Sequence, residues 1–94
     1  MTEYTAPQRD MRFVMDELLN MPEHYASLPG CEDATPDLIS AIREEGAKFS
    51  ANILSPLNQV GDREGCSWKD GEVTTPTGFK EAYHQFCEAG WTRL

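Results

Sequence analysis

The chain has 94 residues, of which 39% are hydrophobic and 26% charged, and its formal net charge is −8. This length allows one domain or a piece of one, with a modest hydrophobic core. The acidic balance argues against nucleic acid and anionic membranes as partners, because both reward clustered basic residues, whereas the eight lysines and arginines are scattered singly along the sequence. No run approaches the ~20 apolar residues of a membrane span, and the N-terminus carries no signal or transit pattern, so we expect a cytoplasmic protein.

The first twenty residues predict an extended arm over 1–9 followed by a short helix. The Ala6-Pro7 step disfavours helix, and Asp10 offers an N-cap for a helix that ends near Asn20. Phe13 lies on the opposite side from the apolar face, which suggests contacts on two sides or a single exposed aromatic. The apolar face of this helix consists of Met11, Val14, Met15, Leu18 and Leu19. Residues 21–34, rich in proline, glycine and acidic side chains, read as a connector without a sustained period.

The segment from Pro36 to Asn58 has the periodicity of a long core helix that the rest of the chain covers. Thr35 can cap its start, and Pro36 suits the first helical position. Gly46 lies inside the apolar arc, which favours a close crossing by another helix. The arc consists of Leu38, Ile39, Ile42, Phe49, Ile53 and Leu57.

Two further features of this segment concern its surface and its end. Glu44 precedes Lys48 by four residues, the spacing of a favourable ion pair on a helix. Ser55-Pro56 should bend the helix or end it within a few residues. The following stretch, Val60 to Gly65, reads as a loop by composition.

The region from Ser67 to Thr75 predicts a small β-hairpin. Asp70-Gly71 is a strong signal for a two-residue turn, with a short strand on each side. Because a lone hairpin is only marginally stable, we expect Trp68 and Val73 to pack on a helix.

A third helix is predicted from about Gly78 to Glu88, and Gly90 should stop it. Its apolar stripe consists of Phe79, Ala82, Tyr83, Phe86 and Cys87, and its solvent face of Lys80, Glu81, His84, Gln85 and Glu88. We therefore expect Phe86 to be buried. The fold class is all-α: a short N-terminal helix, a long core helix and a third helix, with a small hairpin between the last two.

No constellation of side chains predicts catalytic, cofactor-binding or metal-binding residues. His84 and Cys87 have a spacing that two metal ligands could share, but no set of four ligands converges in the sequence. The other candidates, Cys31, Cys66 and His24, lie in three unrelated places, and there is no C-x-x-C. A Cys-His nucleophilic pair would lack an orienting third group and an oxyanion hole. Three irregularly spaced cysteines suit reduced thiols in a cytosol.

Long strings of the sequence resemble the flavin-dependent acyl-CoA dehydrogenases, in particular one large branch with an N-terminal extension. Residues 4–19 resemble the Y-x-A-P-x-x-D-M-x-F-x-L-x-E-L-L type of string that opens proteins of this branch. The likeness covers essentially the whole chain, although Gly46 departs from the alanine that the pattern leads us to expect. It continues through Asp37-Leu-Ile39, Lys48-Phe49, Leu54-Ser-Pro-Leu-Asn58, Gly61-Asp62, Gly65, Val73, Pro76, Gly78-Phe-Lys-Glu-Ala-Tyr83 and Gly90-Trp91.

The resemblance implies an N-terminal segment of such an enzyme, with residues 1–33 as the extension and residues 34–94 as the beginning of the N-terminal helical domain. In this family FAD binds between a middle β-domain and a C-terminal four-helix bundle, in a homo-oligomer. A glutamate far downstream takes the α-proton of the acyl-CoA, and an electron-transfer flavoprotein accepts the electrons. None of the family's catalytic or FAD-binding motifs falls within these 94 residues, so the chain alone is expected to be scaffold, binding no FAD. The alternative is a free-standing small helical module for protein–protein interaction.

Overall fold

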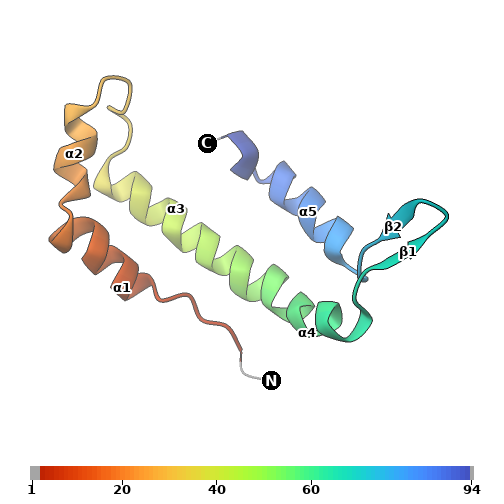
Figure 1. Ribbon diagram of the computed structural model, residues 1–94. Helices are drawn as coiled ribbons and strands as arrows, with labels where there is room; N and C mark the ends of the chain where they lie inside the picture. The colour runs from red at the N-terminus through yellow and green to blue at the C-terminus, as the bar shows by residue number, and fades with distance from the viewer. Residues whose placement is uncertain (1–2, 94) are drawn as a thin grey trace. The chain divides into compact units, whose positions relative to one another are not determined.

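The computed structural model describes residues 3–93, which are mostly helical with one small antiparallel hairpin, as predicted (Figure 1). The chain forms two compact units, one extending to Ala51 and the other starting at Asn52. The boundary falls in a π-helical turn, Ser50–Leu54. The first two residues of the expected arm, and Leu94, lie outside the described residues.

The first helix begins earlier than the sequence indicated. Residues 3–7 have no regular structure, and α1 (Gln8–Arg12) continues directly into a π-helical turn, Phe13–Leu18. The expected N-cap at Asp10 is wrong, because the backbone N–H of Met11 already donates to the carbonyl of Pro7 at 3.0 Å. Asp10 instead lies in the first turn, where the helix dipole favours a negative charge.

A second helix, α2 (Met21–Ser27), occupies much of the segment that we expected to be an irregular connector. Asn20 separates it from the preceding turn by adopting a left-handed conformation, with φ of 48°. Pro22 stands in the first turn of α2, and the Asn20 side chain donates a hydrogen bond to the carboxylate of Glu23. The Asn-Met-Pro-Glu string was therefore a helix-start signal, but the short helix has too few turns to show an apolar period.

The long helix begins as predicted. α3 (Pro36–Phe49) starts at Thr35, whose hydroxyl accepts a hydrogen bond from a first-turn N–H at 3.3 Å. Its last turn differs in detail, since Lys48 pairs with Glu45 at 3.1 Å rather than with Glu44. Both side chains of this pair are exposed, so it adds little stability.

The apolar arc of the long helix is only partly covered, contrary to the expectation that the rest of the chain would enclose it. α1 runs beside α3 in the opposite direction (Figure 1), yet no residue of α3 is fully buried. Leu38 remains 45% exposed, and the other members of the arc, Ile39, Ile42, Phe49, Ile53 and Leu57, are half-buried. The close crossing expected at Gly46 stays a prediction.

The helix does not end soon after Ser55-Pro56, so of the two expected effects only a bend stays a prediction, and the expected loop over Val60 to Gly65 is wrong. The π-helical turn passes directly into α4 (Ser55–Glu64). Pro56 lies in the first turn of α4, where a missing backbone N–H removes little. α4 stops only at Gly65, which has a φ of 62°.

In the second unit, α4 and α5 (Phe79–Glu88) approach each other closely at two glycines. A Cβ atom at Gly61 would lie 2.7 Å from the Phe79 ring, so the ring packs where Gly61 has no side chain. In the same way a Cβ at Gly78 would lie 2.7 Å from a methyl group of Leu57. Gly78 also has a φ of 90°, which strains other residues. The glycine that looked like a loop signal is thus the site of a close approach.

The β-hairpin forms as predicted. β1 (Ser67–Lys69) pairs with β2 (Glu72–Thr74). Asp70 and Gly71 both have positive φ, 53° and 82°, as a two-residue hairpin turn of type I′ requires.

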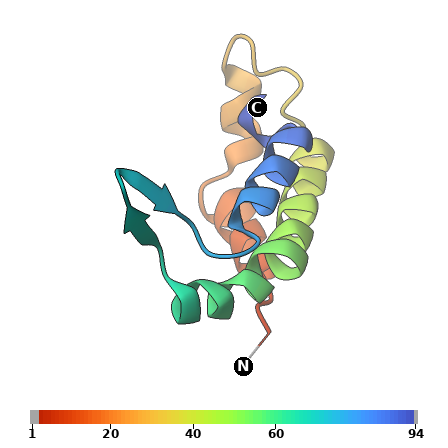
Figure 2. The same cartoon turned by 90° about the vertical axis from the view of Figure 1, so that its right-hand side faces the viewer.

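The expected packing of this hairpin on a helix is wrong. Trp68 and Val73 lie directly opposite each other on the two strands but are 71% and 66% exposed. In both views the hairpin stands away from α4 and α5 (Figures 1 and 2). These two side chains are therefore cross-strand neighbours that stay mostly exposed to solvent.

α5 is amphipathic as predicted, but its inner face is rotated from the expected one. Ala82 is 6% exposed and lies at the centre of this face. Phe86 is 37% exposed rather than buried, and stacks on Trp91 with 6.3 Å between ring centroids. Tyr83 is exposed, and Gln85, expected on the solvent face, is half-buried. Truncating Phe86 should therefore cost less than the ~3–5 kcal/mol of a fully buried ring.

The carboxylate of Glu64 joins the two ends of the segment that contains the hairpin. Oε1 of Glu64 accepts two hydrogen bonds from Thr77, one from its hydroxyl at 2.8 Å and one from its backbone N–H at 3.2 Å. These bonds favour the charged form and hold the pKa of Glu64 below its ordinary value of 4.5. They link the end of α4 to the start of α5.

This link should be sensitive to acid. A carboxylate whose pKa is lowered by folding stabilises the fold above its unfolded pKa, and the contribution is lost as the pH falls through the folded pKa. We expect the amide of Thr77 to be protected from hydrogen exchange at neutral pH and to lose that protection below about pH 4.5, after correction for intrinsic exchange rates. Glu64→Ala should remove the pH dependence, whereas Glu88→Ala, on the exposed side of α5, should not. Unchanged Thr77 protection in Glu64→Ala would show that the link contributes nothing.

Candidate functional site

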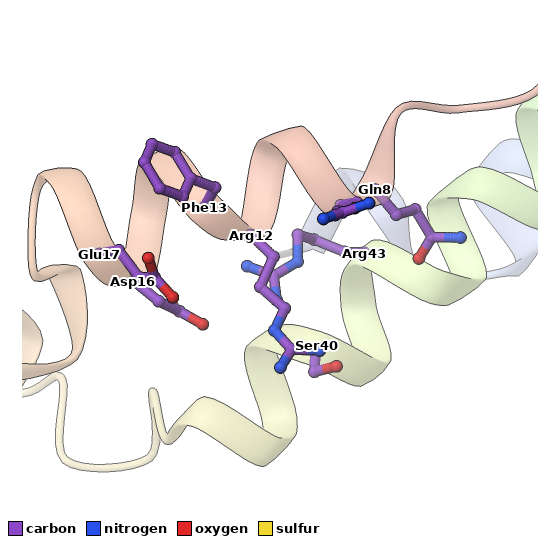
Figure 3. A pocket seen from close by; sticks show the side chains of 8 residues that line it. Gln8, Arg12, Phe13, Asp16, Glu17, Ser40 and Arg43 are labelled. Carbon is purple, nitrogen blue, oxygen red and sulfur yellow. The ribbon is translucent and has the colours of Figure 1, made fainter.

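An open hollow of about 870 Å³ lies between the first helix and α3, within the first unit (Figure 3). It is lined mainly by polar side chains from both helices: Gln8, Arg9, Arg12, Phe13, Asp16, Glu17, Ser40 and Arg43. The two helices thus face each other here with charged groups, and not with the apolar stripe that a two-helix core would use.

Three arginines gather at this hollow, although the sequence showed only isolated basic residues. Arg9 and Arg12 are one helical turn apart on α1, and Arg43 comes from α3. In Figure 3 the side chains of Arg12 and Arg43 reach from the two helices into the space between them. The expectation that the basic residues are scattered is therefore wrong for Arg9, Arg12 and Arg43, which lie together at this hollow. The Arg9–Arg12 spacing was visible in the sequence, but the approach of Arg43 depends on the fold.

The hydrogen-bonding capacity of Arg43 is poorly used. Its side chain is half-buried, and its guanidinium donates to the sulfur of Met15 at 3.2 Å. A thioether is a weak acceptor. Asp16 and Glu17 line the same hollow, yet the ion pair found in the described part of the chain is elsewhere, between Lys48 and Glu45. The arginines of the hollow thus have donors to spare.

Chemically, the hollow suits recognition of an anion rather than catalysis. A guanidinium presents a planar fork of donors that matches carboxylate and phosphate groups. Ser40 and Gln8 add neutral hydrogen-bonding groups to the lining. The lining holds no histidine, cysteine or lysine for acid–base or nucleophilic chemistry.

The exposed apolar side chains of the first helix form a second candidate surface. Phe13 and Leu18 are 54% and 66% exposed, and Figure 3 shows Phe13 pointing away from α3. Met15 alone of the predicted apolar face is half-buried, and the others, Met11, Val14, Leu18 and Leu19, are exposed. In the π-helical turn, where Leu19 bonds to Val14 five residues earlier, side chains no longer follow the α-helical period used to predict the face.

The accessible surface of the chain is large for its mass. It amounts to 7549 Å², whereas a compact monomer of 10.6 kDa exposes about 5,500 Å². Even two separate compact units of these sizes would expose only about 6,600 Å².

The candidate metal and nucleophile residues do not form a site in the described part of the chain. His84 is exposed and Cys87 half-buried on α5, Cys66 and His24 are exposed, and Cys31 is half-buried. The neighbouring Cys87 side chain raises the pKa of Tyr83 above its usual value of 10.0. Among residues 3–93, no group of three or more histidine, cysteine or acidic side chains could hold a metal ion. Within the same residues, no helix is long and apolar enough to cross a membrane.

Comparison with known proteins confirms the resemblance to acyl-CoA dehydrogenases. No family model matches the chain. The chain is similar to the 3-methylmercaptopropionyl-CoA dehydrogenase of Ruegeria pomeroyi, with 36% identity over 97% of the chain. It is also similar to the butyryl-CoA dehydrogenase of Syntrophomonas wolfei, with 33% identity over 93% of the chain. It spans only 15% of the length of each of these relatives. The chain is therefore related to acyl-CoA dehydrogenases over nearly all of its own length and corresponds to a small part of them.

Proposed function

We propose that this chain is the N-terminal segment of an FAD-dependent acyl-CoA dehydrogenase and serves that enzyme as a scaffold for assembly. The match to acyl-CoA dehydrogenases over 97% of the chain but 15% of the relative carries this proposal. Exposed large side chains such as Phe13, Leu18 and Trp68 support it, because a segment that packs against more protein must expose apolar area when it is taken alone.

Residues 1–33 would form the N-terminal extension, and residues 34–94 the beginning of the N-terminal helical domain. This division follows the opening string at residues 4–19 and the later strings of the resemblance. The partners would be the remaining domains or subunits of the enzyme, in a cytoplasmic homo-oligomer.

The chemistry would belong to the rest of the enzyme. FAD and the acyl-CoA thioester would bind in the domains that follow, where the flavin accepts a hydride and a glutamate takes the α-proton, with an electron-transfer flavoprotein as acceptor. In this proposal the segment supplies no acid–base pair or phosphate-binding loop to that reaction and acts through packing. No catalytic or cofactor-binding residue is assigned within it.

The proposal predicts a separation between chemistry and assembly. The isolated 94-residue chain should be colourless and inactive toward acyl-CoA with an artificial electron acceptor. The assembled enzyme lacking residues 1–20 should retain flavin and turnover per active site but lose native mass or melt at a lower temperature. The measurements are flavin absorbance, native mass spectrometry and thermal melting, with the intact enzyme as control.

Two results would contradict the scaffold role. One is a stoichiometric flavin band or turnover in the isolated chain. The other is a truncated enzyme with unchanged mass and melting temperature. A reading frame that continues for several hundred residues past Leu94 would support the segment assignment, and one that stops there would favour the free-standing interaction module.

A further inference from the structure

Among the described residues the arginines of the hollow form no ion pair, although Asp16 and Glu17 line it as well. Arg43 is half-buried, and its hydrogen-bond partner is the sulfur of Met15. Arg12 approaches the same space from the facing helix (Figure 3). Two guanidinium groups that converge without an ion pair repel each other, and this repulsion becomes attraction once an oxyanion lies between them.

The donor geometry favours a carboxylate or a phosphate. Arginine forks pair with either group through two parallel hydrogen bonds, and Ser40 can add a third donor from the same wall. The hollow also contains Asp16 and Glu17, so its own balance is three positive charges against two negative ones. This small surplus matches one carboxylate better than a phosphate with nearly two charges.

The net charge of the whole chain favours binding of a carboxylate that belongs to a docked protein segment over binding of a free anion from solution. At −8 the chain repels anions from solution at long range. A carboxylate carried by a protein segment that is already docked meets the hollow at a high effective concentration, so the long-range repulsion matters much less. The exposed apolar face beside the hollow gives such a segment a surface on which to dock.

We propose that the hollow lined by Arg9, Arg12 and Arg43 receives an acidic side chain from the rest of the acyl-CoA dehydrogenase, and that this ion pair fixes the first helix to the enzyme. The inference rests on the proposed function and adds the chemistry by which the segment is recognised. The apolar face of the first helix supplies contact area, and the arginines set the position in which it docks.

The test uses the assembled enzyme and follows amide hydrogen exchange of residues 8–18. In the double variant Arg12→Gln, Arg43→Gln these amides should exchange at least about tenfold faster than in the wild type, because a carboxylate buried on assembly would lose its partners. Raising the NaCl concentration from about 20 mM to about 500 mM should speed exchange in the wild type but have little effect in the variant. The matched control is Arg63→Gln, in the last turn of α4 and outside the hollow, which should behave as the wild type.

The outcomes separate this inference from the scaffold proposal. If residues 8–18 are protected in the wild-type enzyme and the double variant exchanges at the same rate, the ion pair is refuted and the scaffold role stands. If these residues exchange as fast in the wild-type enzyme as in the isolated chain, the scaffold role itself fails. As a further arm, acetate and inorganic phosphate are titrated into the isolated chain to about 10 mM, where the proposal expects no saturable binding. Submillimolar binding of either ion would show a site for free anions and overturn the tethered partner.

Discussion

Replacing Gly61 with alanine should destabilise the second unit by about 1–3 kcal/mol, the usual range for overpacking. In an ordinary helix interior the same change stabilises by about 1 kcal/mol, because glycine is the poorer helix former. Here the effect on the free energy of unfolding has the opposite sign because the Phe79 ring lies 2.7 Å from where the new methyl carbon would be. Relief of this clash requires either that the Phe79 ring, which is 38% exposed, swings outward or that α4 and α5 separate.

A double-mutant cycle with Phe79→Ala tests this explanation. Once the ring is absent, Gly61→Ala should become stabilising by about 1 kcal/mol. The measurement is urea denaturation of the 94-residue chain, with Gln59→Ala, an exposed position on the same helix, as the control. If Gly61→Ala is stabilising in both backgrounds, the close approach of α4 and α5 is not a constraint on stability.

In the isolated chain, the amides of residues 11–19 should exchange at least about a hundredfold faster than in the assembled enzyme. A helix of this length is marginal on its own in water. Burying exposed residues such as Phe13, Leu18 and Leu19 on a partner would contribute about 1.5–3 kcal/mol each, which is more than this factor requires.

The dependence on concentration distinguishes the possible causes of protection. At low concentration we expect rapid exchange in residues 11–19, and at high concentration slower exchange if two copies cover each other's apolar faces. The amides of α5 serve as the internal control, because that helix packs on α4 within its own unit. Strong protection of residues 11–19 that does not change on dilution of a monomer would mean that the segment closes its own core. The free-standing interaction module would then be the better hypothesis.

Features specified by short local strings were predictable from the sequence. The Asp70-Gly71 turn and the start of α3 at Thr35 were both located correctly, since each depends on one or two residues with a strong backbone preference. α2 was not predicted, because a helix of two turns is too short to show an apolar period. Its start was nevertheless indicated by Asn20, Pro22 and Glu23, which are typical of a helix N-terminus.

Features that depend on packing were harder to predict from the sequence. The same glycine at position 61 is a loop signal in sequence and a contact point in the structure, and only the Phe79 ring decides between them. The inner face of α5 was placed by assuming that its largest aromatic residues were buried, whereas Ala82 occupies the centre. The arginine hollow combines residues more than thirty positions apart, and no local pattern predicts that Arg43 faces Arg12.

The exposed Trp68 on the hairpin has an optical consequence. The chain contains only one other tryptophan, Trp91, which is half-buried and stacked on Phe86. The two indoles therefore report different environments, with Trp68 emitting as a solvated fluorophore and open to collisional quenchers such as iodide or acrylamide. A partner that covers the hairpin would shift the emission of Trp68 to shorter wavelength and shield it from the quencher, while Trp91 would change little. A Trp68→Phe variant shows the fluorescence of Trp91 alone, and the difference from the wild type gives the fluorescence of Trp68. The two native tryptophans therefore report, without an attached label, whether the hairpin is covered when the enzyme assembles.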